Sequence, residues 1–263
     1  MRLLSFALIL VLLFLVAPQE SAAMRKNSRR TKNLTIQIDF RSARAVIDLL
    51  NRAQVGDAEL DAAALSGNRQ LIKKVFGDDL VQGRETFKKT LRQIIEGQPM
   101  AEDPFDWQNV KQHLPEINLL IEQIERNQPQ LLAETENIIA PYTPADLKIE
   151  TAAVFLVGGG SLGFAFSDDP DFYVGLHKAG GDYEGLKYLI AHELYHSIQQ
   201  VGVRRRLAGA QPVKRPENIA KSAMLVDNVY LEGTATFVGN PLEANNLKQF
   251  GQARQDEYRQ NRE

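Results

Sequence analysis

The residues best suited to chemistry in this sequence form the stretch HELYH, residues 192–196. Only 4 histidines occur in the chain of 263 residues, and two of them stand here, four positions apart. Residues four apart are neighbours on one face of a helix, so His192 and His196 can direct a ring nitrogen at the same metal ion. Glu193 lies beside them, where it can take a proton from a water molecule on that metal. The pattern predicts a metal site with Glu193 as the catalytic base.

The surroundings of this stretch favour metal binding over a chance pattern. Residues 185–201 are otherwise rich in apolar side chains and have the composition of a buried helix. Burying two imidazole rings and a carboxylate there is costly unless they are paired or bind an ion. The chain has no cysteine, so its ligands must offer nitrogen or oxygen. We therefore predict Zn²⁺; a polar cluster without metal and a helical adaptor with an accidental motif are the alternatives.

A catalytic zinc ion needs a third protein ligand and one open position. Both other histidines precede the motif, which leaves the carboxylates that follow it: Glu217, Asp227, Glu232 and Glu243. Glu217 is explained by the first turn of a helix, where a carboxylate is favourable, and Glu243 follows the end of that helix.

Glu232 is the preferred third ligand and Asp227 the reserve. Glu232 stands in mid-helix among apolar residues, where an unpaired carboxylate would be expensive. Gly233 and Ala235 follow it, and such small residues would let two helices approach closely. The predicted metal ligands are therefore His192, His196 and Glu232.

Two helices must position these residues. The first is expected to begin at a cap formed by Asp182 and to run to about Val201. The second should begin at Pro216, a favoured first position, and end at Gly239. Three short strands are expected before them, at residues 152–157, 161–166 and 171–177.

A glycine-rich stretch, residues 158–163, joins the first two of these strands and matches the pattern G-x-G-x-x-G. A phosphate-binding loop of this type must open into a helix, whereas FAFSDDPD follows here. We therefore predict a glycine-rich hairpin or bulge. In the acidic turn that follows, residues 168–171, we expect a solvated loop rather than a calcium site, and His177 is expected at the surface or in support of a ligand.

The first half of the chain supplies packing rather than chemistry. Residues 34–40 alternate between apolar and polar side chains, as a half-buried strand does. Ser42 can then cap a helix that reaches about Arg52. Several short helices should follow, each ending near Gly or Pro. The expected organisation is a mainly helical region at 34–150 and a metal-binding core at 151–263. The fold class is α+β, with a small mixed sheet.

The first residues resemble a secretory signal. Residues 1–23 contain a basic start, an apolar run and the small residues Ser21-Ala22-Ala23, as a cleavable signal peptide does. A basic, flexible segment is expected at 24–33; its positive charge opposes translocation and leaves an uncleaved membrane anchor as the alternative. We expect a secreted or periplasmic protein. The formal net charge of −2 gives no reason to expect nucleic acid as a partner.

The motif HELYH, followed on a later helix by LEGTA, resembles the gluzincin type of zinc metallopeptidase. The sequence is also similar to uncharacterised families of zinc-dependent peptidases. The resemblance implies that His192, His196 and Glu232 bind zinc, that Glu193 is the base, and that the substrate is a peptide or protein. It also implies that an exposed edge strand at FYVGL pairs with the substrate backbone; an ordinary sheet strand without this role is the alternative. A secreted zinc-binding protein that has kept the site without turnover remains the second functional hypothesis.

Overall fold

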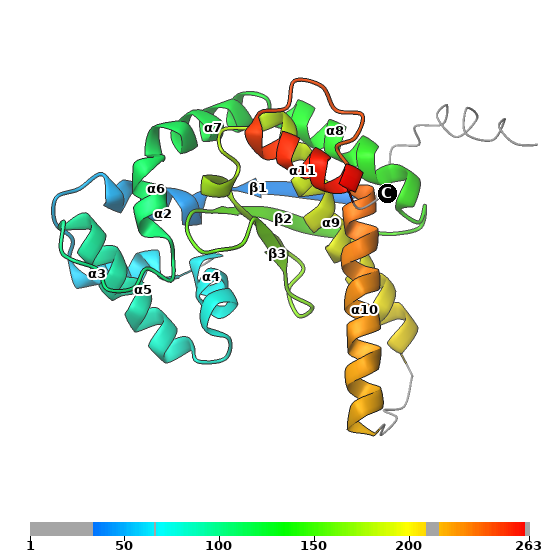
Figure 1. The fold of residues 1–263 in the computed structure, drawn as a ribbon, viewed down its shortest axis with the longest axis horizontal. Helices are drawn as coiled ribbons and strands as arrows, with labels where there is room; N and C mark the ends of the chain where they lie inside the picture. Colours follow the sequence, from blue (N-terminus) through cyan, green and yellow to red (C-terminus); the bar gives the residue numbers. More distant parts are fainter. Residues whose placement is uncertain (1–33, 66, 209–215, 261–263) are drawn as a thin grey trace, which may run out of the picture. The chain divides into compact units, whose positions relative to one another are not determined.

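The computed structural model describes residues 34–65, 67–208 and 216–260, which belong to one compact unit (Figure 1). They are mostly helical and include a small mixed sheet, which confirms the α+β class. The predicted signal peptide, residues 1–23, and the basic segment at 24–33 lie outside the described residues. Within the described ranges no helix is long and apolar enough to cross a membrane.

The first half of the described chain is a strand followed by short helices. Its elements are β1 Leu34–Asp39, α2 Arg41–Leu50, α3 Asp57–Ala63, α4 Gly67–Phe76, α5 Leu80–Ile95, α6 Trp107–Gln112, α7 Leu114–Arg126, α8 Gln128–Ile139 and the 3-10 turn η2 Ala140–Tyr142. Ser42 does not cap α2, because the helix begins one residue earlier. Its buried hydroxyl instead accepts a hydrogen bond from the Gly67 amide at 3.0 Å, which ties α2 to α4.

The sheet has the strand order β1-β2-β4-β3. Its other strands are β2 Ile149–Leu156, β3 Gly163–Ala165 and β4 Phe172–Gly175. β1 and β4 both pair with β2 in parallel, whereas β3 pairs with β4 in the antiparallel direction. The expectation that FYVG forms an exposed edge is therefore wrong: β4 is fully buried between two strands. The edge on the side of the motif helix is β3.

Helices cover both faces of β2, which explains its continuous apolar run. Val154 and Leu156 face α4, where a β-carbon at Gly67 would meet their side chains at 2.6 and 3.3 Å. Phe155 points the other way, as alternate residues of a strand do, and its ring stacks on Phe40 at 4.8 Å between centroids. This central strand leads directly into the glycine-rich stretch.

The glycine-rich stretch neither forms a hairpin nor opens a helix. It crosses from β2 to β3, which are not neighbours in the sheet. Gly158 has a φ of +97°, and a β-carbon there would meet the Trp107 ring at 2.6 Å. His177 is buried rather than at the surface: its Nδ1 accepts from the Gly158 amide at 3.1 Å and its Nε2 donates to the Gly159 carbonyl at 3.0 Å. The loop is thus held by a neutral histidine ring.

The acidic turn between β3 and β4 uses its carboxylates in contacts with the rest of the protein. Asp169 accepts hydrogen bonds from the Tyr173 hydroxyl at 2.6 Å and from the Gln70 amide at 3.0 Å. Asp168 forms an ion pair with Lys73 at 3.0 Å. These contacts fix the hairpin that places β3 at the edge of the sheet.

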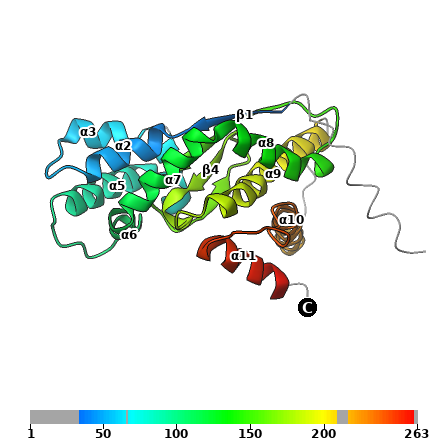
Figure 2. The same cartoon turned by 90° about the horizontal axis from the view of Figure 1, so that it is seen from above.

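The remaining elements carry the predicted chemistry. They are the 3-10 turn η3 Leu176–Lys178, α9 Tyr183–Leu207, α10 Glu217–Val238 and α11 Gln249–Gln260. Asp182 caps α9 as predicted, with its side chain accepting from the Gly185 amide at 2.8 Å, but the helix continues beyond Val201. α9 packs on β2, β3 and β4, while α10 and α11 lie on its side away from β1 (Figure 2).

Candidate metal centre and active site

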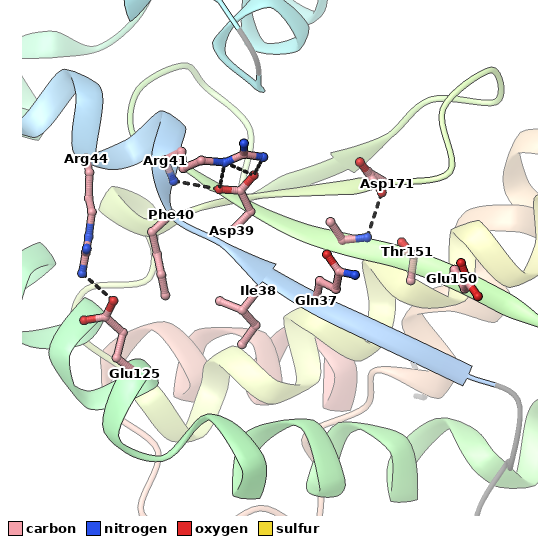
Figure 3. A pocket seen from close by; sticks show the side chains of 11 residues that line it. Gln37, Ile38, Asp39, Phe40, Arg41, Arg44, Glu125, Glu150, Thr151 and Asp171 are labelled. Carbon is pink, nitrogen blue, oxygen red and sulfur yellow. Dashed lines mark hydrogen bonds and ion pairs between the residues drawn. The ribbon is translucent and has the colours of Figure 1, made fainter.

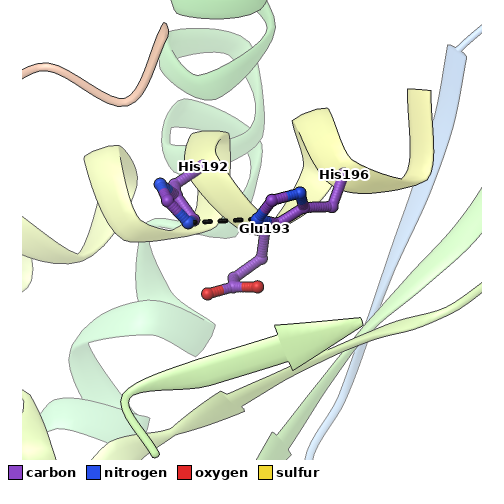
Figure 4. A group of neighbouring side chains, drawn as sticks. All are labelled: His192, Glu193 and His196. Atoms are coloured by element: carbon purple, nitrogen blue, oxygen red, sulfur yellow. Dashed lines mark hydrogen bonds between the residues drawn. The ribbon is translucent and has the colours of Figure 1, made fainter. Parts of the chain in front are cut away.

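The two motif histidines lie one turn apart on α9, with their rings edge to face (Figure 4). The Nε2 atoms of His192 and His196 are 3.2 Å apart, and their side chains are 11% and 13% exposed. Their shared face follows from the four-residue spacing on a helix. Two nitrogen atoms that can each offer a lone pair therefore meet at the edge of the protein interior.

A third donor comes from α10. One carboxylate oxygen of Glu232, Oε2, lies 3.6 Å from Nε2 of His192 and 3.5 Å from Nε2 of His196. The reserve candidate, Asp227, is exposed more than one turn earlier on the same helix. Glu217 lies at the start of α10, where it pairs with Lys221 at 2.6 Å. Of the carboxylates considered in the described part of α10, Glu232 is the one brought to both rings.

The argument that selected Glu232 from the sequence was nevertheless wrong. Its apolar neighbours on α10 are not buried: Leu225, Val229, Tyr230 and Phe237 are between 55% and 66% exposed. The Glu232 side chain itself is 68% exposed. Gly233 is not a point of close approach either, because a β-carbon there would meet nothing within 4 Å.

The two helices approach closely at Ala235 and just beyond the end of α10. Ala235 is fully buried, as the spacing of small residues suggested. A β-carbon at Gly239, just beyond α10, would lie 2.6 Å from the Tyr188 carbonyl oxygen and 2.8 Å from Cβ of His192. The end of α10 therefore packs directly on the turn of α9 that carries the first histidine.

The chemistry of these three donors fits a zinc ion. Ligands about 2.0–2.1 Å from a tetrahedral zinc lie about 3.3–3.4 Å from one another. The observed separations of 3.2, 3.5 and 3.6 Å scatter around this value. Two imidazole lone pairs and a carboxylate oxygen this close repel each other unless a proton or a cation lies between them. The donor set is nitrogen and oxygen only, and Glu232 is open to solvent on one side.

Gln199 fixes the orientation of the second ring. Its Oε1 lies 2.8 Å from Nδ1 of His196, and its Nε2 donates to the Leu231 carbonyl at 2.9 Å and to Oγ1 of Thr234 at 2.6 Å. With the amide nitrogen committed to α10, the amide oxygen accepts the proton on Nδ1. His196 therefore keeps an unprotonated Nε2 directed at the site.

Burial keeps the first ring neutral, because it lowers the pKa of His192 to about 3. A positive charge on His196 or on Arg254 would act in the same direction. The Ala235 carbonyl lies close enough to oppose this effect, but Nδ1 of His192 makes no hydrogen bond of ordinary geometry. A neutral imidazole is the form that binds metal.

Glu193 points away from the two rings, towards the neighbouring strand (Figure 4). A β-carbon at Gly163 of β3 would lie 2.5 Å from its Oε1 and 2.7 Å from its Cδ, so only glycine leaves room for this carboxylate. Burial, followed by the negative charge of Glu232, raises the pKa of Glu193 to about 8. A cation held by the histidines would favour the ionised form.

The site residues lie inside a family match. A family model described as "Putative zinc dependent peptidase (DUF5700)" matches residues 61–263. The chain belongs to this family. Comparisons with curated proteins and with solved structures found no match. Membership in this zinc-dependent peptidase family agrees with a group of His192, Glu193 and His196 whose ligand atoms lie within 4.8 Å of one another.

A hollow in the described structure of this family member lies elsewhere. It has a volume of about 750 Å³, and residues of β1, β2, α2 and α7 are among those that line it (Figure 3). Its basic groups are already paired, Arg41 with Asp39 at 2.6 Å and Arg44 with Glu125. None of the motif residues lines it. This hollow is therefore separate from the histidine pair.

Two residues of the site were missed from the sequence. Gln199 follows His196 by three positions, and this spacing on one face was the available signal. Gly163 belonged to the glycine-rich stretch, but nothing local indicated that it faces Glu193. That contact depends on the pairing of β3 with β4 and on the packing of α9 across them.

Proposed function

We propose that this protein is a zinc-dependent peptidase of the gluzincin type. His192, His196 and Glu232 hold the metal in this proposal, and Glu193 is the base that hydrolysis of a peptide bond requires. The observation that carries it is the convergence of three metal-binding atoms at separations of 3.2–3.6 Å, with a buried carboxylate beside them. The family description supports the same activity.

The residues of the chain have distinct tasks in this mechanism. Zinc, when bound, supplies a Lewis acid that polarises the scissile carbonyl and lowers the pKa of water to about 7. Glu193 accepts a proton from the attacking water and delivers it to the nitrogen of the leaving amine. Gln199 keeps Nε2 of His196 free of a proton, and Gly163 gives the Glu193 carboxylate its position.

The edge strand β3 is the proposed platform for the substrate backbone. It pairs with β4 on one side only, and Glu193 lies against it at Gly163. An extended peptide that adds to this edge would have its scissile carbonyl fixed beside the base. The role expected for FYVGL from the resemblance thus passes to the strand next to it.

Glu193→Gln tests the proposal directly. We expect this variant to retain stoichiometric zinc and to lose at least about 100-fold in kcat, because the amide cannot accept the proton. Glu232→Gln should instead lower the affinity for zinc, whereas Asp227→Asn on the same helix should change neither property. Metal analysis and peptidase assays of the four proteins provide the comparison.

Each other outcome has a defined meaning. Stoichiometric zinc without hydrolysis in the wild type would support the second hypothesis, a zinc-binding protein without turnover. The absence of bound zinc in the wild type would contradict both and leave an accidental motif. Hydrolysis that survives in Glu193→Gln would contradict the assignment of the base alone.

We also propose, from the sequence of residues 1–23, that the protein is secreted or periplasmic and acts on peptides or proteins there. Cell fractionation with N-terminal sequencing of the mature protein tests this. An intact apolar segment in the membrane fraction would favour the anchored alternative.

A further inference from the structure

One side of α10 is apolar but uncovered in the described structure. The helix packs chiefly on α9, towards which it directs Ala235 and the carboxylate of Glu232. On its opposite side, four large apolar side chains are between 51% and 66% exposed: Ile219, Val226, Tyr230 and Phe237. An exposed apolar face of this kind usually marks an interaction surface.

The residues on this side are spaced as in a coiled coil. Apolar or small residues recur at alternating intervals of four and three positions: Ile219, Ala223, Val226, Tyr230, Gly233 and Phe237. This period of 3.5 residues keeps them in one line along the helix. A β-carbon at Gly233 would meet nothing within 4 Å, so the line is open there as well. We call these six residues the α10 seam.

The α10 seam is complementary to itself when two copies of α10 run antiparallel. A two-fold axis beside Asn228 brings each large residue to a large one of the second copy and brings the two small residues to each other. The pairs are Val226 with the partner's Tyr230, Ile219 with the partner's Phe237, and Ala223 with the partner's Gly233. Small residues at the same level allow the two backbones to approach.

The surface is large enough for a weak dimer. The four large side chains of each copy would together remove about 700 Å² of apolar surface from water. Val229 and the other residues that flank the α10 seam bring the interface to roughly 1,000 Å², where specific interfaces begin. At each end, the partner's Ile219 would pack on Phe237 and on the Tyr142 ring, whose centroids are 5.7 Å apart. We therefore expect a dimer that dissociates at micromolar concentrations.

Other occupants fit this face less well. α10 has a single basic residue, Lys221, which pairs with Glu217, whereas a helix that lies on an anionic membrane carries several. The segments at 209–215 and 261–263 read GAQPVKR and NRE, which offer little apolar surface. The apolar run at 3–17 belongs to the proposed signal peptide. A second copy, in contrast, brings an apolar line of the same length and spacing.

We propose that two copies of this protein associate through the α10 seam, with their α10 helices antiparallel. Within each copy, α10 then lies between α9 and the partner's α10. Glu232 is on the side of α10 towards α9 and takes no part in the interface. The inference goes beyond the proposed peptidase function and depends on neither zinc nor turnover.

Sedimentation velocity of the purified protein, from nanomolar to high micromolar concentrations, measures the association. We expect a reversible monomer–dimer equilibrium. Val226→Asp should raise the dissociation constant at least about tenfold, because it places an unpaired charge at the centre of an apolar interface. Leu225→Asp is the matched control, since Leu225 is 65% exposed and adjacent to Val226 but lies outside the α10 seam. This variant should associate as the wild type does.

Disulfide formation tests the antiparallel register. The chain has no cysteine, so Val226→Cys and Tyr230→Cys each introduce a single thiol. In an equal mixture of these two variants, the mixed disulfide should exceed the share expected from random pairing, because the two positions lie opposite each other. Mass spectrometry distinguishes the mixed product from both homodimers. Leu225→Cys mixed with Tyr230→Cys is the control and should show no such excess.

A wild type that stays monomeric throughout would overturn the proposal. If that monomer sediments with vesicles of phosphatidylcholine and phosphatidylserine, the face belongs to a lipid surface instead. Association that survives Val226→Asp, or that Leu225→Asp weakens equally, would assign the contact to other residues, such as the apolar run at 3–17. Random pairing of the thiols would contradict the antiparallel arrangement.

Discussion

Gly163 carries no side chain, and the carboxylate of Glu193 occupies the space where a β-carbon would stand. The HELYH spacing alone identified the two rings and the acid between them, because these residues are neighbours on one helix. The position of the acid relative to substrate depends instead on a strand far away in the sequence. Local spacing could predict which residues lie together on the helix but not what holds the Glu193 carboxylate in place.

Gly163→Ala should therefore leave the metal site intact and impair catalysis. The added methyl group displaces Glu193 rather than the backbone, since β-carbon contacts at 2.5–2.7 Å all involve this one side chain. A shift of about 1 Å in the base is expected to lower kcat by roughly ten- to a hundredfold. Gly160→Ala is the matched control, because a β-carbon there meets nothing within 4 Å. If Gly163→Ala and the wild type had the same kcat and the same zinc content, the role of Gly163 would be contradicted.

Gln199→Ala should weaken zinc binding. Without Oε1 beside Nδ1 of His196, the ring loses the partner that fixes its tautomer and its orientation. Loss of such a supporting hydrogen bond raises the dissociation constant for metal by roughly 10- to 100-fold. Competition with a zinc chelator measures this dissociation constant. Gln200→Ala, which removes the neighbouring side-chain amide, is the control and should leave the constant unchanged. An unchanged constant would mean that His196 is oriented by packing alone.

At the scale of elements, the start of α9 and the end of α10 were predictable, whereas the start of α2 and the end of α9 were not. Asp182 and Gly239 mark the limits of α9 and α10 as capping chemistry suggests. The order of the strands was not predictable, because β4 becomes internal only through its antiparallel pairing with β3. The exposure of α10 was missed for a similar reason: an apolar helix does not reveal from its sequence whether a neighbour covers it.

Asp182 connects α9 to α11, so its removal should lower the free energy of unfolding more than the removal of an ordinary helix cap. It is 1% exposed and accepts from the amides of Gly185, Lys248 and Gly251. We expect Asp182→Ala to lower the free energy of unfolding by about 2–4 kcal/mol. Asp79→Ala, which removes the exposed cap of α5, should cost about 1 kcal/mol. Chemical denaturation of both variants makes the comparison, and equal losses would show that the contacts to α11 add nothing.

At the scale of the whole molecule, stability should depend on the protonation of His177. Burial lowers the pKa of His177 to about 4, and its Nδ1 must stay unprotonated to accept from Gly158. The unfolded chain takes up this proton near pH 6.5 and the folded protein only near pH 4. The contribution of neutral His177 to the free energy of unfolding is therefore fully present above pH 6.5 and is lost as the pH falls towards 4.

The loss amounts to at most about 3 kcal/mol. His177→Gln should be less stable at pH 7, and its free energy of unfolding should fall less steeply than that of the wild type between pH 6.5 and 4. Denaturation at a series of pH values gives both curves. Parallel curves over this interval would contradict the contribution of His177.

The three proposed metal ligands come from two helices, and α10 exposes Leu225, Val229 and Tyr230 to solvent in the turns before Glu232. Little apolar packing therefore holds these turns in place. An ion bound by residues of both helices would hold them together. The free energy of binding the ion would then include the cost of ordering α10 against α9. The affinity for the ion and the order of the helix pair would then depend on each other. A substitution that loosens α10 far from any ligand would weaken both.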